Sequence, residues 1–278
     1  MWKSPSNLKI SEWADKYRKL SPESSAEAGA WNTSRSPYQK EIMDVFNEPN
    51  IQRIVVMSSS QVGKTEIILN TIAYYVDQDP SPMMIVQPTL QMGQAFSKDR
   101  LSAMIRDTEK IRECFKEART RDSGNTVLHK KFPSGHLTIV GSNSASGLAS
   151  RPIRVLLLDE VDRYDASAGT EGDPTELAIA RTKTFFNRKI YMCSTPTVKG
   201  LSRIESAFLE SDQRYYYVPC PECDHKQKLV WKNVIWEEDK PETARYACEN
   251  CGSLIDESKK QWMLKHGEWI ASAPTPVS

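Results

Sequence analysis

Residues 58–65 have the types and spacing of a loop that binds the phosphates of a nucleotide. They read Ser-Ser-Ser-Gln-Val-Gly-Lys-Thr and follow an apolar run that starts at Ile51. In such a loop, backbone N–H groups surround the phosphates, the lysine reaches the β and γ phosphates, and the final hydroxyl holds Mg²⁺. We expect a helix to begin near Gly63 and to direct its positive end at the anion. The predicted residues of this ATP and Mg²⁺ site are Ser58, Ser59, Ser60, Gln61, Val62, Gly63, Lys64 and Thr65.

The loop departs from the usual pattern at its first position, where Ser58 replaces glycine. Serine tolerates a positive φ less well than glycine, so we expect a first bend that is not strongly left-handed. The alternative interpretation is an ordinary strand–turn–helix whose lysine is merely solvated. The β-rich run before the loop and the helical spacing of Glu66–Tyr74 favour nucleotide binding.

Two adjacent carboxylates supply the metal side of the predicted site. Asp159 and Glu160 follow the apolar run Val155–Leu158, which indicates a central parallel strand buried on both faces. Ligands of open α/β sheets bind at the carboxyl ends of the strands. We expect Asp159 to order Mg²⁺ and Glu160 to act as the general base toward the attacking water. The alternative is a strand followed by a solvated acidic turn.

A further strand pattern, Arg188–Cys193, ends in the hydroxyls of Ser194 and Thr195 before a proline. These hydroxyls are candidates for sensing the γ-phosphate and passing its loss to neighbouring elements. The alternative is that Ser194 or Thr195 caps a helix over Lys199–Leu209. The pattern by itself does not separate the two.

The segment Ser36-Pro-Tyr-Gln39 supports two interpretations. A serine N-cap, a proline at the first helical position and a glutamine three residues after the serine make a capping box. The functional interpretation has Tyr38 stacking on adenine and Gln39 hydrogen-bonding the edge of the base, as in helicase-type nucleotide enzymes.

Four of the six cysteines form two C-x-x-C pairs, Cys220/Cys223 and Cys248/Cys251. Two such pairs separated by a few tens of residues are typical of a zinc ribbon, in which four thiolates hold one tetrahedral Zn²⁺. Disulfides or a redox pair are the alternatives, but the sequence shows no signal peptide that would favour disulfides. His225 is a possible substitute ligand. Cys114 and Cys193 are most simply buried thiols.

Alternating helix and strand patterns predict the fold class. We expect an α/β domain, a RecA-like P-loop NTPase with a doubly wound, mostly parallel sheet, and a small zinc-ribbon β module. Strand-like pieces at Lys228–Lys232 and Val234–Trp236 belong to that module. The strands expected in the sheet are Ile51–Met57, Met83–Gln87, Ile153–Leu158 and Lys189–Cys193.

The length of 278 residues accommodates one large and one small domain. Trp13, Tyr17 and Leu20 are spaced to share one face of an amphipathic helix, and 256–267 also looks helical. The predicted organisation is an N-terminal helical segment (1–35), the P-loop ATPase domain (36–212), the zinc-ribbon module (213–256), and a C-terminal helix and linker (257–278).

The net charge is +1, so any contact with DNA must come from local patches. A probable hairpin over Thr126–Val140, turning at Pro133–Gly135, is flanked by such a cluster. Its basic residues are Arg119, Arg121, Lys130 and Lys131, and the alternative is a solvated face. No run is long or apolar enough to span a bilayer, so we expect no membrane partner.

Taken together, these residues resemble the ATPase portion of the terminase large subunit of tailed bacteriophages, of the lambda type. The resemblance rests on the variant loop ending in Val62-Gly-Lys-Thr65, the acidic motif Leu156–Arg163, the segment Cys193–Pro196, and the paired C-x-x-C motifs after the ATPase core. It implies an ATP hydrolase that drives viral DNA packaging into a procapsid, in the host cell cytoplasm.

The resemblance also implies partners: double-stranded viral DNA, a small terminase subunit, the portal of the procapsid, and a homo-oligomeric ring in which a neighbour donates an arginine. Arg151 and Arg181 are the candidates for an arginine that stabilises charge on the γ-phosphate, and ordinary surface ion pairs are the alternative. The family's nuclease domain has no counterpart among the residues after Gly252, so we do not expect this chain to cut DNA alone.

Two other functions fit parts of the pattern. One is a helicase or other nucleic-acid translocase, against which the absence of a second RecA-like domain counts. The other is a non-catalytic zinc-ribbon assembly module with a decayed nucleotide site, against which the intact Lys64, Thr65, Asp159 and Glu160 count.

Overall fold

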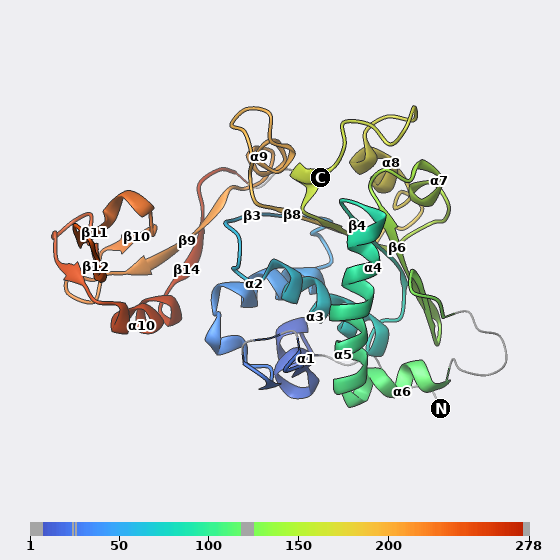
Figure 1. The fold of residues 1–278 in the computed structure, drawn as a ribbon, viewed down its shortest axis with the longest axis horizontal. Helices are drawn as coiled ribbons and strands as arrows, with labels where there is room; N and C mark the ends of the chain where they lie inside the picture. Colours follow the sequence, from blue (N-terminus) through green and yellow to red (C-terminus); the bar gives the residue numbers. More distant parts are fainter. Residues whose placement is uncertain (1–7, 24, 26, 118–124, 275–278) are drawn as a thin grey trace. The chain divides into compact units, whose positions relative to one another are not determined.

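The computed structural model describes residues 8–23, 25, 27–117 and 125–274, and the chain divides into two compact units (Figure 1). The first comprises Met1–Trp31 and Ile42–Phe208, and the second comprises Asn32–Glu41 and Leu209–Ser278. The expected organisation placed 32–35 in the N-terminal segment and 36–41 in the ATPase domain, whereas these residues cluster here with the cysteine-rich part of the chain.

A six-stranded sheet forms the centre of the first unit. Its neighbouring strands are parallel, except for the edge pair β5 and β6, which is antiparallel. The α/β fold with a mostly parallel sheet is therefore confirmed. In spatial order the strands are β3 (Arg53–Met57), β8 (Lys189–Ser194), β7 (Val155–Asp159), β4 (Pro82–Gln87), β6 (Gly135–Gly141) and β5 (His129–Phe132).

Helices cover both faces of this sheet, as expected for a doubly wound fold (Figure 1). One face packs against α1 (Ile10–Tyr17), α3 (Lys64–Asp77), α5 (Ser102–Asp107) and α6 (Glu109–Glu117). The other packs against α7 (Ala145–Leu148), α8 (Pro174–Ala180) and α9 (Arg203–Leu209). Every residue of β7 is buried because its side chains alternate between two covered faces. Apolar side chains hold the strand ends, where the candidate site residues lie, in fixed positions.

The N-terminal helix is shorter than its apolar spacing suggested. It ends at Tyr17, and Leu20 lies in β1 (Lys19–Leu20), paired with β2 (Gly29–Ala30). The remaining elements before residue 209 are α2 (Tyr38–Asp44), α4 (Leu90–Ala95), the π-helical segment η3 (Phe96–Leu101), and the 3₁₀ turns η1 (Thr33–Arg35), η2 (Val45–Asn47) and η4 (Val161–Arg163). Of these, η1 and the first turn of α2 belong to the second unit.

The second unit contains two small sheets. One joins β10 (Lys226–Gln227), β9 (Arg214–Pro219) and β14 (Glu268–Ala271), and the other joins β11 (Val234–Glu237), β12 (Lys240–Ala247) and β13 (Leu254–Ile255). The 3₁₀ turn η6 (Glu257–Lys259) and α10 (Lys260–Lys265) precede β14.

Two expectations for this unit are wrong. Residues 228–232 are not a strand, because Trp231–Asn233 form the 3₁₀ turn η5. The segment 257–278 is not helix and linker alone, because its residues 268–271 form a strand that pairs with β9.

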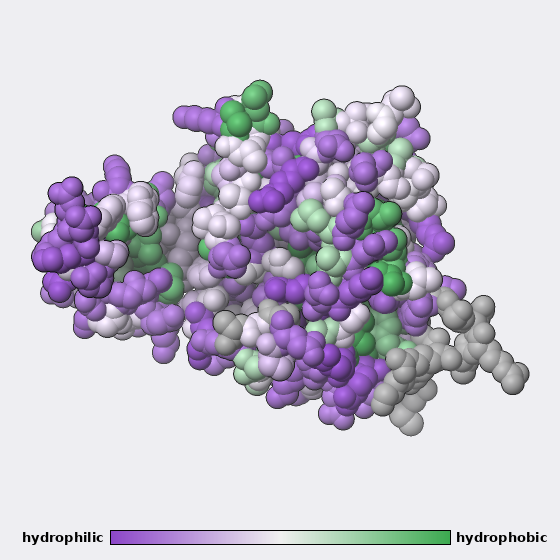
Figure 2. Space-filling view, viewed as in Figure 1, coloured by the Kyte–Doolittle hydropathy of each residue, from purple (hydrophilic) through white to green (hydrophobic). Residues whose placement is uncertain are grey.

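Hydrophilic side chains cover most of the surface seen in Figure 2, with smaller apolar areas between them. Exposed aliphatic residues include Val198 and Leu201, in the loop that precedes α9. Among the described residues, none of the helices has the length and apolar character needed to cross a membrane.

Candidate active site

The predicted phosphate loop leaves β3 beside β8, where Ser58 N donates to Ser194 O at 3.2 Å. The left-handed residues of the loop are Gln61 (φ 62°) and Gly63 (φ 85°), and Ser58 is not among them, as its residue type predicted. Helix α3 begins at Lys64, with Gly63 as its N-cap and no side chain capping it. The helix start therefore offers its positive end to an anion.

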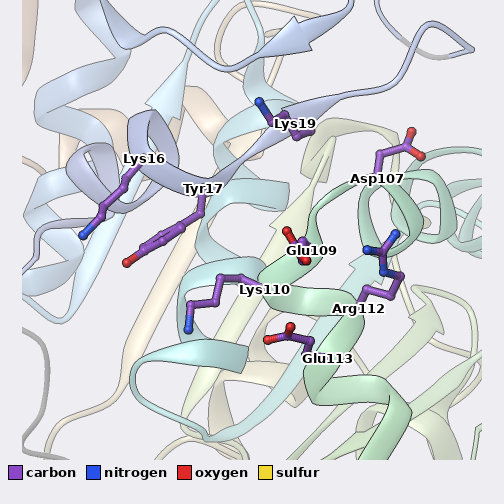
Figure 3. Close-up of a pocket in the computed structure, with 8 residues that line it drawn as sticks. All are labelled: Lys16, Tyr17, Lys19, Asp107, Glu109, Lys110, Arg112 and Glu113. Carbon is purple, nitrogen blue, oxygen red and sulfur yellow. The ribbon is translucent and has the colours of Figure 1, made fainter.

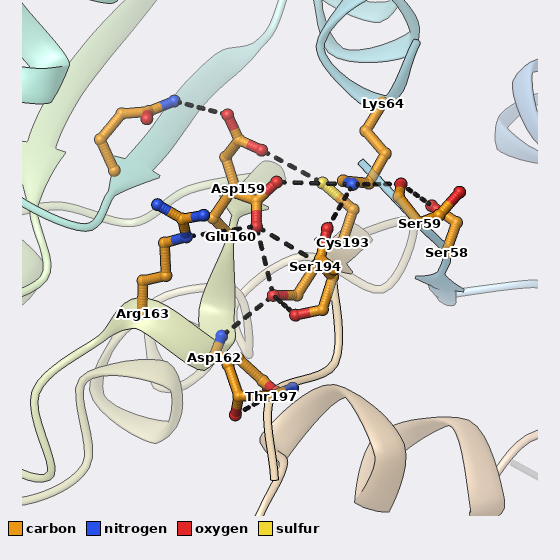
Figure 4. A network of polar contacts seen from close by, with 12 residues as sticks. Ser58, Ser59, Lys64, Asp159, Glu160, Asp162, Arg163, Cys193, Ser194 and Thr197 are labelled. Carbon is orange, nitrogen blue, oxygen red and sulfur yellow. Dashed lines mark hydrogen bonds and ion pairs between the residues drawn. The ribbon is translucent and has the colours of Figure 1, made fainter. Parts of the chain in front are cut away.

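Lys64 is buried, with 6% of its surface exposed. Its Nζ donates to Ser59 O at 2.9 Å and to Thr195 Oγ1 at 3.0 Å, and it lies 3.5 Å from Glu160 Oε1. Figure 4 shows Lys64 pointing toward the acidic residues at the end of β7. The alternative of a merely solvated lysine is wrong.

Asp159 is the last residue of β7 and is also buried. Its Oδ2 accepts a hydrogen bond of 2.9 Å from Gln87 Nε2, and its Oδ1 accepts one of 3.3 Å from Cys193 Sγ. Burial raises the pKa of Asp159, and these two hydrogen bonds oppose that shift by favouring the carboxylate. Asp159 is therefore oriented from two neighbouring strands and does not lie in a solvated turn.

Glu160 adopts a left-handed conformation (φ 53°, ψ 53°), which costs a non-glycine residue about 1–3 kcal/mol. Its Oε2 accepts from Thr195 N at 3.4 Å and lies 3.8 Å from Arg163 Nε. The turn is held by Arg203, whose guanidinium donates to the carbonyls of Val161, Tyr164 and Asp165. The strained turn thus places the Glu160 carboxylate between Lys64 and Arg163.

Thr195 reaches this site because of the strand order. Strand β8 lies between β3, which leads into the phosphate loop, and β7, which ends at Asp159. Ser194 Oγ accepts from Asp162 N at 3.2 Å. Neither hydroxyl caps the next helix, because α9 begins at Arg203 and Asp162 Oδ1 accepts from Ile204 N at 2.8 Å. The capping alternative is wrong. Ser194 belongs to the polar network of Figure 4, and Thr195 Oγ1 accepts a hydrogen bond from Lys64 Nζ.

Asp162 connects this network to the following loop, a contact that the motif spacing did not indicate. Its Oδ2 accepts from Thr197 N at 3.0 Å and from Thr197 Oγ1 at 3.1 Å. Burial raises the pKa of Asp162, but hydrogen bonds from Ser202, Ile204 and Thr197 outweigh it and leave the pKa lowered. An ionised Asp162 therefore holds both ends of the exposed loop between β8 and α9.

The structure does not bring Arg151 or Arg181 to Lys64. Arg181 O accepts from Ile153 N at 3.0 Å and its Nη1 donates to Ala149 O at 3.3 Å, so it lies beside the amino end of β7. The acidic pair lies at the other end of this five-residue strand, and each residue spans about 3.3 Å. Among the residues that the structure describes, the arginine paired with Glu160 is Arg163, which sequence reasoning did not single out.

Tyr38 and Gln39 belong to the second unit. The Tyr38 ring meets Tyr216 edge-on at 6.0 Å, and Tyr38 O accepts from Trp269 Nε1 at 2.9 Å. Helix α2 begins at Tyr38, and Gln39 N donates to Ser36 O at 2.9 Å. A role of these residues in adenine binding stays a prediction.

The four cysteines of the C-x-x-C pairs form one cluster, with all sulfurs within 4.8 Å of one another. Cys220 Sγ lies 3.9 Å from Cys251 Sγ, and Cys223 Sγ lies 3.8 Å from Cys248 Sγ. Thiolates about 2.3 Å from a tetrahedral metal ion are about 3.8 Å apart, so the spacing fits such an ion. His225 is not part of the cluster, because its ring pairs with Glu249 at 3.2 Å.

The other two cysteines differ from each other. Cys193 is buried, as expected, but it also orients Asp159, whereas Cys114 is only half-buried.

Comparison with known proteins places these observations in one family. The family described as phage terminase large subunit gpA, ATPase domain, matches residues 25–269. The large terminase subunit of Enterobacteria phage P21 is 30% identical over 274 residues, covering 96% of this chain and 42% of that protein. The subunit of Escherichia phage lambda is 28% identical over 252 residues, covering 88% of this chain and 39% of that protein. The chain thus spans about two fifths of these relatives.

Among solved structures, the large terminase ATPase domain of Thermus phage P74-26 is similar with a TM-score of 0.40, at 16% identity, over 58% of this chain and 64% of that one. The large terminase from a thermophilic bacteriophage gives a TM-score of 0.36, at 12% identity, over 59% of this chain and 38% of that one. The family match over most of the sequence shows that this chain belongs to the ATPase domains of phage terminase large subunits and is an ATP hydrolase.

Proposed function

We propose that this chain couples ATP hydrolysis to the movement of double-stranded viral DNA into a procapsid. The observation that carries the proposal is the convergence of Lys64, Glu160 and Thr195 at the carboxyl edge of the parallel sheet, with distances of 3.5 Å and 3.0 Å from Lys64 Nζ. A cation, a carboxylate and a hydroxyl that follow the ends of β3, β7 and β8 meet where nucleotides bind in open α/β sheets.

In this proposal the loop Ser58–Thr65 holds the triphosphate, and Lys64 neutralises the β and γ phosphates. Thr65 and Asp159 hold Mg²⁺, which supplies charge neutralisation when bound. Glu160 takes the proton of the attacking water. Ser194 and Thr195 respond to loss of the γ-phosphate, and Asp162 extends that response to α9 through its bonds to Thr197 and Ile204.

The remaining assignments follow from family membership and the cysteine geometry. We propose that the cluster holds one structural Zn²⁺ in a module over 213–256, next to an ATPase domain over 36–212. The flanking parts are the N-terminal helical segment (1–35) and the C-terminal segment (257–278), of which 268–271 is the strand β14. The proposed partners are viral DNA, a small terminase subunit, the portal and further copies of the chain in a ring, acting in the host cytoplasm.

The decisive experiment measures ATP hydrolysis with and without double-stranded DNA. We expect DNA to stimulate the wild-type rate, Lys64→Ala to abolish nucleotide binding or turnover, and Glu160→Gln to keep binding while slowing hydrolysis about 10²–10⁴-fold. Wild-type turnover by Glu160→Gln would refute the general-base assignment. A wild-type rate that DNA leaves unchanged would refute the coupling to DNA.

A further inference from the structure

A cluster of basic side chains lies on the antiparallel edge of the large sheet, away from the candidate active site. The hairpin turns after Phe132, where Ser134 is left-handed with φ 62°, as the Pro133–Gly135 segment predicted. His129 pairs with Thr138, and Lys131 pairs with His136. Because side chains alternate along a strand, these four residues share one face of the hairpin.

Contacts within this group confirm the shared face. The rings of His129 and His136 are 5.4 Å apart, and His129 Nδ1 lies 3.2 Å from Thr138 Oγ1. Burial, together with the charges of Arg151 and Lys131, lowers the pKa of both imidazoles. The backbone places Arg151 nearby: Arg154 N, three residues further on, donates to Pro82 O at 3.0 Å, and Pro82 pairs with His136. Lys130 alternates to the opposite face and is half-buried, and Arg119 and Arg121 lie outside the described residues.

The group lacks acidic partners within the part of the chain that the structure describes. Lys131 and Arg151 are exposed, and no ion pair joins either of them to a carboxylate. The charges that act on both histidines come from cations alone. Like charges held together without an opposing charge repel one another, so the arrangement is stabilised by an anion that lies across it.

A second basic surface provides the contrast (Figure 3). It is a pocket between α1 and α6 whose cations are interleaved with carboxylates. Its lysines are Lys16, Lys19 and Lys110, and its acids are Asp107, Glu109 and Glu113. The ammonium groups of Lys16 and Lys110 also lie over the ring of Tyr17, at 5.0 Å and 5.7 Å. This mixed surface supplies its own counter-charges, whereas the hairpin surface does not.

We propose that His129, Lys131, His136 and Arg151 bind the phosphate backbone of duplex DNA. The inference rests on the proposed function, which supplies the polyanion, and it adds the residues that contact it. His136 pairs with Pro82, the first residue of β4, whereas Gln87 at the other end of β4 contacts Asp159. The DNA surface and the ATP site therefore lie at opposite ends of the same strand.

The test measures binding of a fluorescent duplex of about 30 base pairs to the 278-residue chain across about 50–200 mM salt. Each phosphate contact contributes roughly 0.9 to the slope of log affinity against log salt. We expect Lys131→Gln/Arg151→Gln to reduce that slope by about 2 and to weaken binding about tenfold at low salt. The matched control, Lys16→Gln/Lys19→Gln, removes two lysines from the mixed pocket and should leave the slope unchanged. Unfolding temperatures confirm that the variants are folded.

A second arm uses the histidines. The groups that face the two imidazoles are Lys131, Thr138 and Arg151, and phosphates placed among them favour the imidazolium forms. We therefore expect DNA affinity to rise as the pH falls from about 8 to about 6, and His129→Gln/His136→Gln to abolish most of that rise.

The outcomes separate the two proposals. One result is that the variants show the same salt slope and pH dependence of DNA affinity as the wild type, while DNA still stimulates hydrolysis by the wild type. That result would refute DNA binding by this surface and leave the proposed function standing. A wild-type chain that neither binds the duplex nor responds to it would overturn both.

Discussion

Gln87 Nε2 donates a hydrogen bond of 2.9 Å to Asp159 Oδ2, and both side chains are buried at the ends of neighbouring strands β4 and β7. The amide is a neutral donor aimed at a carboxylate that burial would otherwise push toward its protonated form. Gln87 therefore orients Asp159 and favours its ionised form, the form that the proposed Mg²⁺ site requires, although no motif points to Gln87.

This contact predicts the behaviour of Gln87→Met, which keeps the volume and removes the donor. A hydrogen bond to a charged group contributes about 1.5–3 kcal/mol, so we expect the Mg²⁺ concentration for half-maximal ATP hydrolysis to rise by about tenfold or more. Saturating Mg²⁺ should restore most of kcat. Ser142→Ala is the control, because it removes the buried hydrogen bond from Ser142 Oγ to Pro88 O without touching Asp159. Equal effects of both variants on Mg²⁺ dependence would contradict the positioning role.

The second prediction concerns Arg163. Its Nε lies 3.8 Å from Glu160 Oε2 and its side chain is 66% exposed, so the pair contributes little to stability. We expect Arg163→Gln to unfold at the wild-type temperature but to hydrolyse ATP about tenfold more slowly or worse, because a cation next to the proposed general base and γ-phosphate position is lost. Arg151→Gln is the matched comparison. If Arg151→Gln hydrolysed ATP more slowly at low protein concentration and Arg163→Gln did not, the role would belong to Arg151 and not to Arg163.

The cysteine cluster predicts about one zinc ion per chain by metal analysis. Cys248→Ser should lose the ion and make the second unit sensitive to protease, because a structural zinc site and its fold form together. Cys114→Ser makes the same chemical change outside the cluster and should retain the ion. Folded, zinc-free wild-type protein would reject the site.

Lys189 predicts a pH dependence of stability. It is buried, its Nζ donates to the carbonyls of Glu48 and Ile51, and burial lowers its pKa from 10.5 to about 8. Between these two values the unfolded chain binds more protons than the folded one, so this group makes stability rise with pH from about 8 to about 10.5. Below about 8 the cost of the buried charge is fully present.

We expect Lys189→Met to lack this rise when free energies of unfolding are measured by urea titration across that pH range. Lys183→Met removes an exposed lysine six residues before Lys189, and this variant should keep the rise of stability with pH. Parallel curves for wild type and Lys189→Met would show that the amine is not held as described.

The sequence determined the local chemistry of this protein. The phosphate loop, the Asp159–Glu160 pair and the two C-x-x-C pairs are each contiguous, so residue type and spacing are sufficient to identify them. The strands of the parallel sheet were predictable because buried strands read as uninterrupted apolar runs. The edge strand β14 was missed because its four residues, three of them exposed, carry no such signal and gain their order from pairing with β9.

The tertiary structure decided which of these residues meet. Strand β8 comes last along the chain of the large sheet, yet it lies between β3 and β7 and thereby brings Thr195 to Lys64, 131 residues away. The same strand order joins Gln87 to Asp159. Arg151 precedes β7 and therefore lies at the end of that strand opposite to the acidic pair. Strand order is fixed by burying both faces of the sheet under helices at once, a requirement of the whole domain that no segment of the sequence records by itself.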